Sequence, residues 1–256
     1  MSKSVRRPNW SALLKGWEAQ QEHSVPDRER RFRAIFDALE GSLPSQFTAL
    51  DLGCGPGSLS VRLLRRFPKA RVIAVDYDPV TLRIGREALG ERGGRLTWVD
   101  ANLGVTGWTD RLPHRRVDAV VSTTALHWLT EPRLRALYRD LGRLLPRNGV
   151  FIDGDYFPWG AKNRGLERLS GKVWTLRLSG RRGAGGWSEW RRWWTAAEKI
   201  PELTAEFAER KRRHAVHPKH EEPPLEVHID ALGRAGFREV GVVWEDFGNR
   251  VLLARR

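Results

Sequence analysis

The chain has 256 residues, enough for one large domain or one domain with a sizeable insertion, and its net charge is +14. Such a charge attracts polyanions, but no long basic run stands out, so a nucleic-acid partner is not favoured. The single cysteine, Cys54, excludes a disulfide within one chain, and the lack of a signal segment or a long apolar run predicts a cytoplasmic protein without membrane association.

Amphipathic helical patterns precede the first expected strand. Apolar residues recur at helical spacing within 10–17 and again within 29–40, where Gly41 and Pro44 end the second pattern. We expect residues 1–29 to form an N-terminal helical segment. Because Trp10, Leu13, Leu14 and Trp17 recur there at helical spacing, we hypothesise that residues 1–26 fold over the ligand site.

A glycine-rich loop follows the first strand. The strand, Phe47–Leu52, carries Asp51 near its end, and the chain then breaks into three glycines, Gly53, Gly55 and Gly57, before a helix begins at Ser58. Such a unit brings backbone N–H groups and a helix N-terminus close to a ligand. Ser58 stands where a dinucleotide-binding loop needs its last glycine. The loop therefore suits a ligand with an ammonium group better than a pyrophosphate.

Strands and helices then alternate. Short apolar strands are predicted at 71–75, 95–99, 117–121 and 149–152, with helices at 79–89 and 131–145 between them. A helix at 229–235 and two strands at 237–244 and 251–253, joined by a turn at 247–249, close the chain. Continuous apolar strands separated by helices indicate an α/β fold with a parallel sheet covered on both faces.

The segment D-L-G-C-G-P-G at Asp51–Gly57, together with the final pair of strands, resembles the class I S-adenosylmethionine-dependent methyltransferases. This resemblance covers residues 30–155 and 226–256. It implies a doubly wound, Rossmann-like sheet of seven strands in the order 3-2-1-4-5-7-6, with strand seven antiparallel. We therefore expect a methyltransferase core of 30–155 and 223–256. Residues 156–222, rich in Trp and Arg, are expected to be a helical insertion between strand five and the last helix that forms a lid.

The resemblance implies S-adenosylmethionine as the cofactor and assigns most of its contacts. Asp51 would orient the methionine ammonium, Asp76 would accept both ribose hydroxyls, and Asp100 would accept from the adenine amino group, while Tyr77 packs on the adenine. The other expected cofactor-binding residues are Gly53, Cys54, Gly55, Gly57, Ala101, Asn102 and Thr123. We interpret Cys54 as a small packing residue, not a nucleophile. Asp78 fits a helix N-cap better than Asp76 does.

The segment after the fourth strand, Ser122–Trp128, reads S-T-T-A-L-H-W. It lacks the N/D-P-P-Y/F/W of amino-nucleobase methyltransferases, and no second cysteine exists for attack on cytosine C5. It resembles the A-L-H/Q-W segment of small-molecule enzymes such as the trans-aconitate, malonyl-carrier and juvenile-hormone acid methyltransferases. His127 is the candidate catalytic residue, as a general base or as a donor that orients the acceptor, and a purely structural role stays open.

The insertion supplies the candidates for acceptor binding: Tyr156, Trp159, Trp190, His217 and His220. The tryptophans near 190 have helical spacing, so packing of a small lid is their default interpretation and an aromatic pocket wall is the alternative. His214, His217 and His220 recur every three residues, but Pro218 breaks a helix there, so we predict no metal site.

These patterns favour methylation of an oxygen or nitrogen of a small-molecule acceptor. One alternative is an RNA or protein methyltransferase that uses the basic insertion, although no separate RNA-binding module is recognisable. Another is a regulatory protein that binds the cofactor without catalysis. The oligomeric state and the acceptor cannot be predicted from these patterns.

Overall fold

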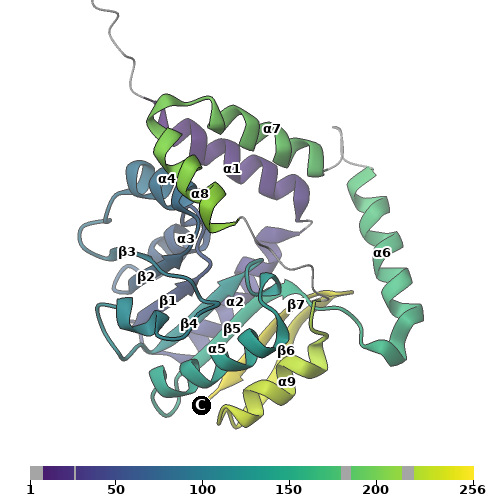
Figure 1. The fold of residues 1–256 in the computed structure, drawn as a ribbon. Coiled ribbons are helices and arrows are strands. Elements are labelled where there is room, and N and C mark those ends of the chain that lie inside the picture. The colour runs from purple at the N-terminus through teal and green to yellow at the C-terminus, as the bar shows by residue number, and fades with distance from the viewer. Residues whose placement is uncertain (1–7, 26, 180–185, 215–221) are drawn as a thin grey trace, which may run out of the picture.

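The computed structural model describes residues 8–25, 27–179, 186–214 and 222–256. Its centre is a seven-stranded sheet in the order β3-β2-β1-β4-β5-β7-β6 (Figure 1). The first five strands are parallel, whereas β7 runs antiparallel to β5 and β6. The strands are β1 Thr48–Leu52, β2 Arg71–Asp76, β3 Leu96–Asp100, β4 Ala119–Thr123, β5 Val150–Tyr156, β6 Glu239–Asp246 and β7 Asn249–Arg255. The predicted fold class and strand order are confirmed.

Helices surround this sheet on both faces and at one end. They are α1 Trp10–Ser24, α2 Arg28–Ser42, α3 Ser58–Arg66, α4 Pro79–Leu89, α5 Glu131–Leu144, α6 Arg164–Ser179, α7 Gly186–Glu198, α8 Thr204–Arg213 and α9 Leu225–Arg234. Within the described part of the chain, no helix has both the length and the apolar character needed to cross a membrane.

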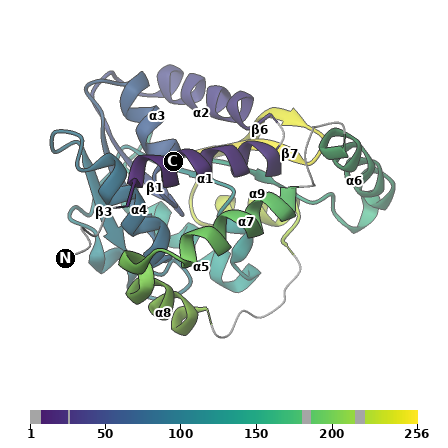
Figure 2. The same cartoon turned by 90° about the horizontal axis from the view of Figure 1, so that it is seen from above.

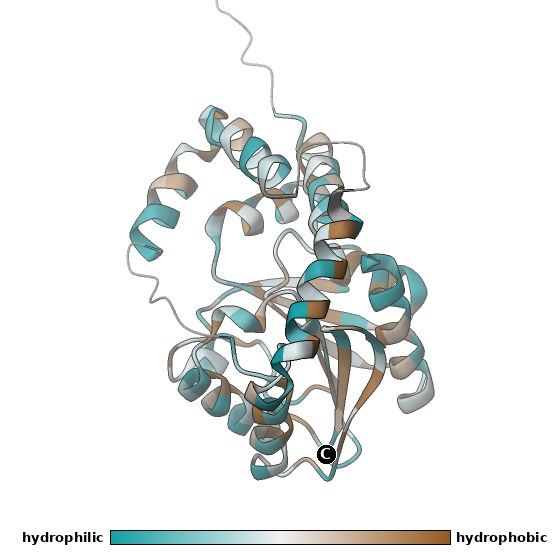
Figure 3. Cartoon of the chain, turned by 90° about the vertical axis from the view of Figure 1, so that its right-hand side faces the viewer, coloured by the Kyte–Doolittle hydropathy of each residue, from teal (hydrophilic) through white to brown (hydrophobic). Residues whose placement is uncertain are grey.

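The two faces of the sheet are covered by amphipathic helices. On one face, α2 contributes Phe32, Ile35 and Leu39, each at most 1% exposed. On the other face, α5 and α9 pack Leu137 and Leu232 against the same strands. Burying side chains of this size stabilises the fold by about 1.5–3 kcal/mol each. The apolar strands are therefore enclosed in the middle of the molecule (Figure 3).

A third helical layer lies over the carboxyl ends of the strands. Helices α1 and α7 run side by side there, and α8 lies beside α4 (Figures 1 and 2). Trp17 of α1 packs edge-on against Trp193 of α7, with ring centroids 5.0 Å apart, and the Trp193 indole donates to the carbonyl of Leu13. The N-terminal segment and the insertion thus build this layer together.

Helix α6 does not join that layer. It projects to the side of the sheet near β6 and β7 (Figure 2). Arg177 ties it to Asp246 of β6 by an ion pair. The insertion expected to form one lid is therefore divided, with α7 and α8 over the strand ends and α6 at the sheet edge.

Candidate functional site

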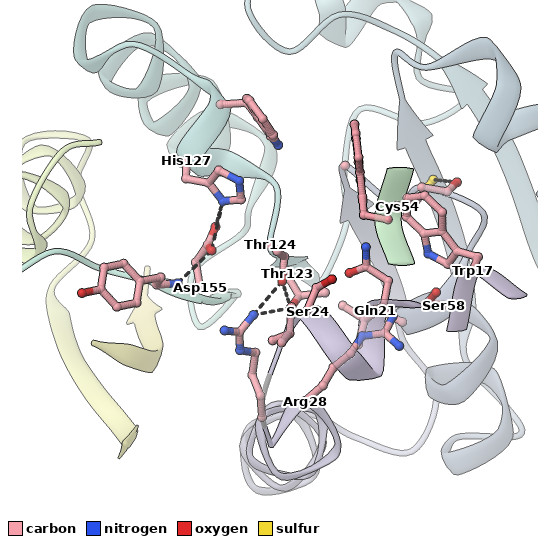
Figure 4. Close-up of a pocket in the computed structure, with 18 of the residues that line it drawn as sticks. Trp17, Gln21, Ser24, Arg28, Cys54, Ser58, Thr123, Thr124, His127 and Asp155 are labelled. Atoms are coloured by element: carbon pink, nitrogen blue, oxygen red, sulfur yellow. Dashed lines mark hydrogen bonds and ion pairs between the residues drawn. The ribbon is translucent and has the colours of Figure 1, made fainter. Parts of the chain in front are cut away.

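A chamber of about 660 Å³ lies at the carboxyl ends of β1, β4 and β5, beneath α1 and α7. Figure 4 shows His127 and Asp155 on one side of it and Trp17 and Cys54 on the other. Its walls include Trp17, Gln21, Arg28, Arg31, Asp51, Gly53, Cys54, Gly55, Thr123, His127, Trp128, Asp155, Tyr156, Trp174, Trp190 and Glu222. The expected cofactor loop and the expected catalytic histidine therefore share one chamber.

The glycine loop needs its glycines for close approach. Gly53 and Gly55 have φ of +67° and +54°, a region that other residues rarely adopt. A Cβ on Gly53 would lie 2.2 Å from the Cβ of Ala125, so the loop is pressed against the segment after β4. Gly57 is the N-cap of α3, and a Cβ there would lie 2.7 Å from the Trp98 ring. Gly57 thus serves packing, while Gly53 and Gly55 line the chamber.

Asp51 and Cys54 are buried side chains of the chamber wall. The Ser60 hydroxyl donates to Asp51 at 2.6 Å, but burial outweighs this bond and raises the pKa of Asp51 to about 7. Burial also raises the pKa of the Cys54 thiol well above its usual value. A neutral thiol is a poor nucleophile, so the packing role expected for Cys54 agrees with its surroundings.

Asp76 fastens the glycine loop to β2. Its carboxylate accepts from the backbone N–H of Gly55 at 2.6 Å, of Tyr77 at 2.7 Å and of Asp78 at 2.8 Å. Burial raises its pKa to about 6. These bonds use three of the about four acceptor positions of a carboxylate, so a bidentate pair with both ribose hydroxyls requires one of them to yield. Asp78 caps α4 through the N–H of Val80, as its position predicted.

The other residues expected to bind the adenine lie in a second cavity. This cavity, of about 430 Å³, is lined by Tyr77, Asp100, Ala101, Asn102 and residues of α8. Asp100 is paired there with Arg213 of α8, at 2.7 Å. The structure thus separates the expected methionine end of the site, in the chamber, from the expected adenine end.

His127 is held by a carboxylate that the sequence analysis did not single out. Its Nδ1 lies 2.9 Å from Asp155 Oδ2, and Asp155 also accepts from the N–H of Tyr156 at 2.8 Å. Burial opposes a charge on His127, but the charge of Asp155 and this hydrogen bond together outweigh it and raise the His127 pKa. In the same way, burial of Asp155 is outweighed by His127 and Arg31, and its pKa is lowered. The signal was present in the sequence, because Asp155 ends an apolar strand as Asp76 and Asp100 do.

Arg31 of α2 also reaches the chamber and was not predicted. Its side chain is 1% exposed and lies between Asn249, which accepts from it at 2.6 Å, and Thr124, which accepts at 2.7 Å. Gly154 O accepts a further bond at 2.9 Å, and burial lowers the pKa of Arg31 to about 10. Thr123, expected at the cofactor, lines the chamber and donates to the same carbonyl. This set of bonds fixes the ends of β4, β5 and β7 relative to one another.

The expected acceptor residues divide into three groups. Tyr156 and Trp190 line the chamber. Trp159 does not: its indole donates to Ser170 at 3.0 Å and Arg250 stacks on its ring at 4.0 Å, so it packs between α6 and β7. His217 and His220 lie outside the described residues.

Comparison with known proteins agrees with this architecture. Residues 49–149 match the methyltransferase domain family. Trans-aconitate 2-methyltransferase of Azoarcus sp. is 32% identical over 167 residues, which cover 65% of this chain and 61% of that protein. The protein of the same name from Mycobacterium sp. (strain KMS) is 39% identical over 105 residues, 40% of this chain and 37% of that protein. The alignments thus span less than two thirds of these relatives.

Solved structures share the fold. Human N-acetylserotonin methyltransferase in complex with SAM has a TM-score of 0.55 at 15% identity, covering 95% of this chain and 55% of that one. PigF with SAH has a TM-score of 0.51 at 16% identity, covering 97% and 67%. The domain match over residues 49–149, the related sequences and the sheet order all agree with the fold of the class I methyltransferases.

Proposed function

We propose that this protein transfers a methyl group from S-adenosylmethionine to an oxygen or nitrogen of a small molecule bound in the chamber. The observation that carries the proposal is that the glycine loop and the His127–Asp155 pair open into one cavity. A methyl donor and a proton-accepting group that share one cavity can act on the same bound acceptor. Two solved structures of the same fold are complexes with SAM and with SAH, which supports this choice of cofactor.

The residues around the loop fit a ligand with an amino-acid end. Asp51 is a buried carboxylate facing the chamber with no basic side chain among its principal interactions, so an ammonium group would stabilise its charge. Gly53 and Gly55 present their backbone to the chamber, and Trp17 packs over Gly55. When bound, the cofactor supplies a methyl group on a sulfonium, which reacts by in-line displacement.

His127 is assigned the role of general base. Asp155 holds Nδ1, which orients the ring and favours a proton on that nitrogen, so the other ring nitrogen is the one that accepts a proton. A hydroxyl acceptor must lose its proton as it is methylated, and an ammonium must lose one before its nitrogen can attack; His127 takes that proton. An ionised carboxylate needs no base, and His127 would then only orient it.

The chamber wall indicates the class of acceptor. Trp128, Trp174, Trp190 and Tyr156 supply an aromatic surface, and Arg28, which is paired with Glu18 at 2.9 Å, supplies a guanidinium that an acidic group would share with Glu18. We propose an acceptor with a planar or apolar body and an acidic group, and the relatives named trans-aconitate 2-methyltransferase make trans-aconitate a natural first probe. Because they line the chamber, we propose Tyr156 and Trp190, but not Trp159, as acceptor-binding residues.

The test is a transfer assay with S-adenosylmethionine carrying an isotopically labelled methyl group. Separate pools of carboxylic acids (trans-aconitate included), phenols, amines, RNA and protein are offered, and labelled products are identified by mass spectrometry. We expect one small-molecule class to be labelled. Cofactor binding without transfer to any pool would favour a regulatory protein, and labelling of RNA or protein alone would favour the macromolecular alternative.

A further inference from the structure

Arg213, the last residue of α8, fills the place where the adenine of the cofactor is expected. Its two terminal nitrogens donate to the two oxygens of Asp100, at 2.7 and 2.9 Å. One of them also donates to the carbonyl of Tyr77 at 2.8 Å, and the guanidinium carbon lies 4.8 Å from the centre of the Tyr77 ring. Arg213 therefore engages both residues assigned to adenine by the family resemblance.

The guanidinium and an adenine would make the same contacts. Both groups are planar, both donate N–H bonds to a carboxylate, and both pack on an aromatic face. A bidentate arginine–carboxylate pair uses both carboxylate oxygens in one plane, which is where an adenine amino group would have to donate. Arg213 and adenine thus compete for Asp100 and Tyr77.

The rest of α8 keeps Arg213 at this place. Arg210 donates to Asp78 at 2.6 Å and stacks on Trp194 of α7 at 4.0 Å. Glu209 accepts from Arg213 at 2.7 Å. These contacts join α8 to the start of α4 on one side and to α7 on the other, so the helix is docked on the site by several residues.

We propose that Arg213 occupies the adenine-binding residues Asp100 and Tyr77 in the ligand-free protein. Arg213 thereby closes the adenosine end of the site until the cofactor displaces it. This inference rests on the proposed function, because it takes the adenosine site as given. Its consequence is quantitative. Only molecules in which Arg213 has left Asp100 can bind the cofactor, so the apparent association constant is the intrinsic one multiplied by the fraction of such molecules. Removing the Arg213 side chain raises this fraction to one and increases the affinity.

The test is calorimetric titration of S-adenosylmethionine, and of adenosine alone, into wild type, Arg213→Gln and Lys211→Gln. Lys211 is an exposed residue of the same helix, so its variant matches the change of charge. We expect Arg213→Gln to bind both ligands about tenfold more tightly, as release of an occupied site predicts, and Lys211→Gln to bind like wild type. Arg213→Lys keeps the charge but loses the planar fork, so its affinity should fall between those of wild type and Arg213→Gln.

The opposite sign would overturn the inference. If Arg213→Gln binds either ligand more weakly than wild type while keeping its melting temperature, Arg213 contacts the bound adenosine and does not exclude it. Equal affinity of all variants overturns the inference too, but leaves the proposed function intact. If wild type and every variant fail to bind S-adenosylmethionine, the proposed function fails as well.

Discussion

Each end of the proposed cofactor site has a carboxylate that is expected to bind the ligand, and the two carboxylates differ in burial and in ion pairing. Asp51, at the methionine end, is buried and its pKa is raised to about 7. Asp100, at the adenosine end, is 41% exposed and already paired with Arg213. A buried carboxylate without a cation gains when an ammonium arrives, whereas a paired carboxylate must first lose its partner. The methionine end therefore favours ligand binding, whereas the adenosine end opposes it.

The largest effect is expected at His127, beside the methionine end. His127→Ala should lower kcat about 100- to 10,000-fold for a hydroxyl or amine acceptor, the usual contribution of a general base. In wild type the rate should rise with pH through a pKa above 6.5, because the base must be unprotonated and Asp155 raises its pKa. Steady-state kinetics over pH checks this, with the exposed His114→Ala as control. Retention of full activity with a carboxylic acid would instead identify an acceptor that needs no base.

The variant Asp51→Asn tests the role of Asp51 at the methionine end of the site. We expect the affinity for S-adenosylmethionine to fall about 100-fold, since a charge-assisted bond to the ammonium is lost. The folded pKa of Asp51, about 7, lies above its unfolded value of about 4, so the ligand-free fold loses stability progressively between about pH 4 and pH 7, and this loss is complete above pH 7. The variant should therefore melt at a higher temperature than wild type at pH above about 7.

Calorimetry and thermal denaturation measure these two effects together. Asp37→Asn, at an exposed position of α2, is the matched control and should change neither. Unchanged cofactor affinity in Asp51→Asn would contradict the assignment of the ammonium to this carboxylate. That result would not affect the assignment of the fold or the roles of His127 and Asp155.

Sequence reasoning succeeded where neighbours along the chain decide the structure. The strand–loop–helix unit from Phe47 to Ser58 is local, and the strand order follows from the rhythm of apolar strands and helices. The expected residues Asp51, Gly53 and His127 meet in one chamber because parallel strands end at one edge of the sheet.

The features of the site that could not be predicted from the sequence depend on contacts between segments that are distant along the chain. Arg31 reaches Asn249, 218 residues away, and Arg213 reaches Asp100, 113 residues away. Basic residues are so frequent in this chain, 45 with lysine included, that no local pattern distinguishes these two. The packing of α1 against α7 could not be predicted either, because the apolar pattern of a helix does not indicate which distant helix it packs against.

The pH dependence of cofactor binding is the next smaller effect. The pKa values of Asp51 and Asp76 are raised to about 7 and about 6, so both carboxylates carry protons at lower pH. A ligand that needs both carboxylates ionised must then displace one proton between pH 6 and 7 and two protons below pH 6, so its affinity should fall by up to about tenfold over the pH unit from 7 to 6 and more steeply below 6. Titrations in buffers of different ionisation enthalpy count the protons released. A pH-independent affinity would contradict a role for these carboxylates, and Asp51→Asn should remove the part near pH 7.

The smallest effect is expected from the layer that covers the methionine end. Trp17 lies over Gly55 and packs against Trp193 and Trp194, whereas Trp244 on β6 is equally large and is not among the residues that line the chamber. Trp17→Ala should weaken cofactor binding about three- to tenfold, because an aromatic contact of about 1 kcal/mol and part of the cover over the loop are lost. Trp244→Ala should leave the affinity unchanged. If Trp17→Ala also binds like wild type, α1 is a structural support for α7 and does not cover the cofactor, and the resistance to binding lies at the adenosine end alone.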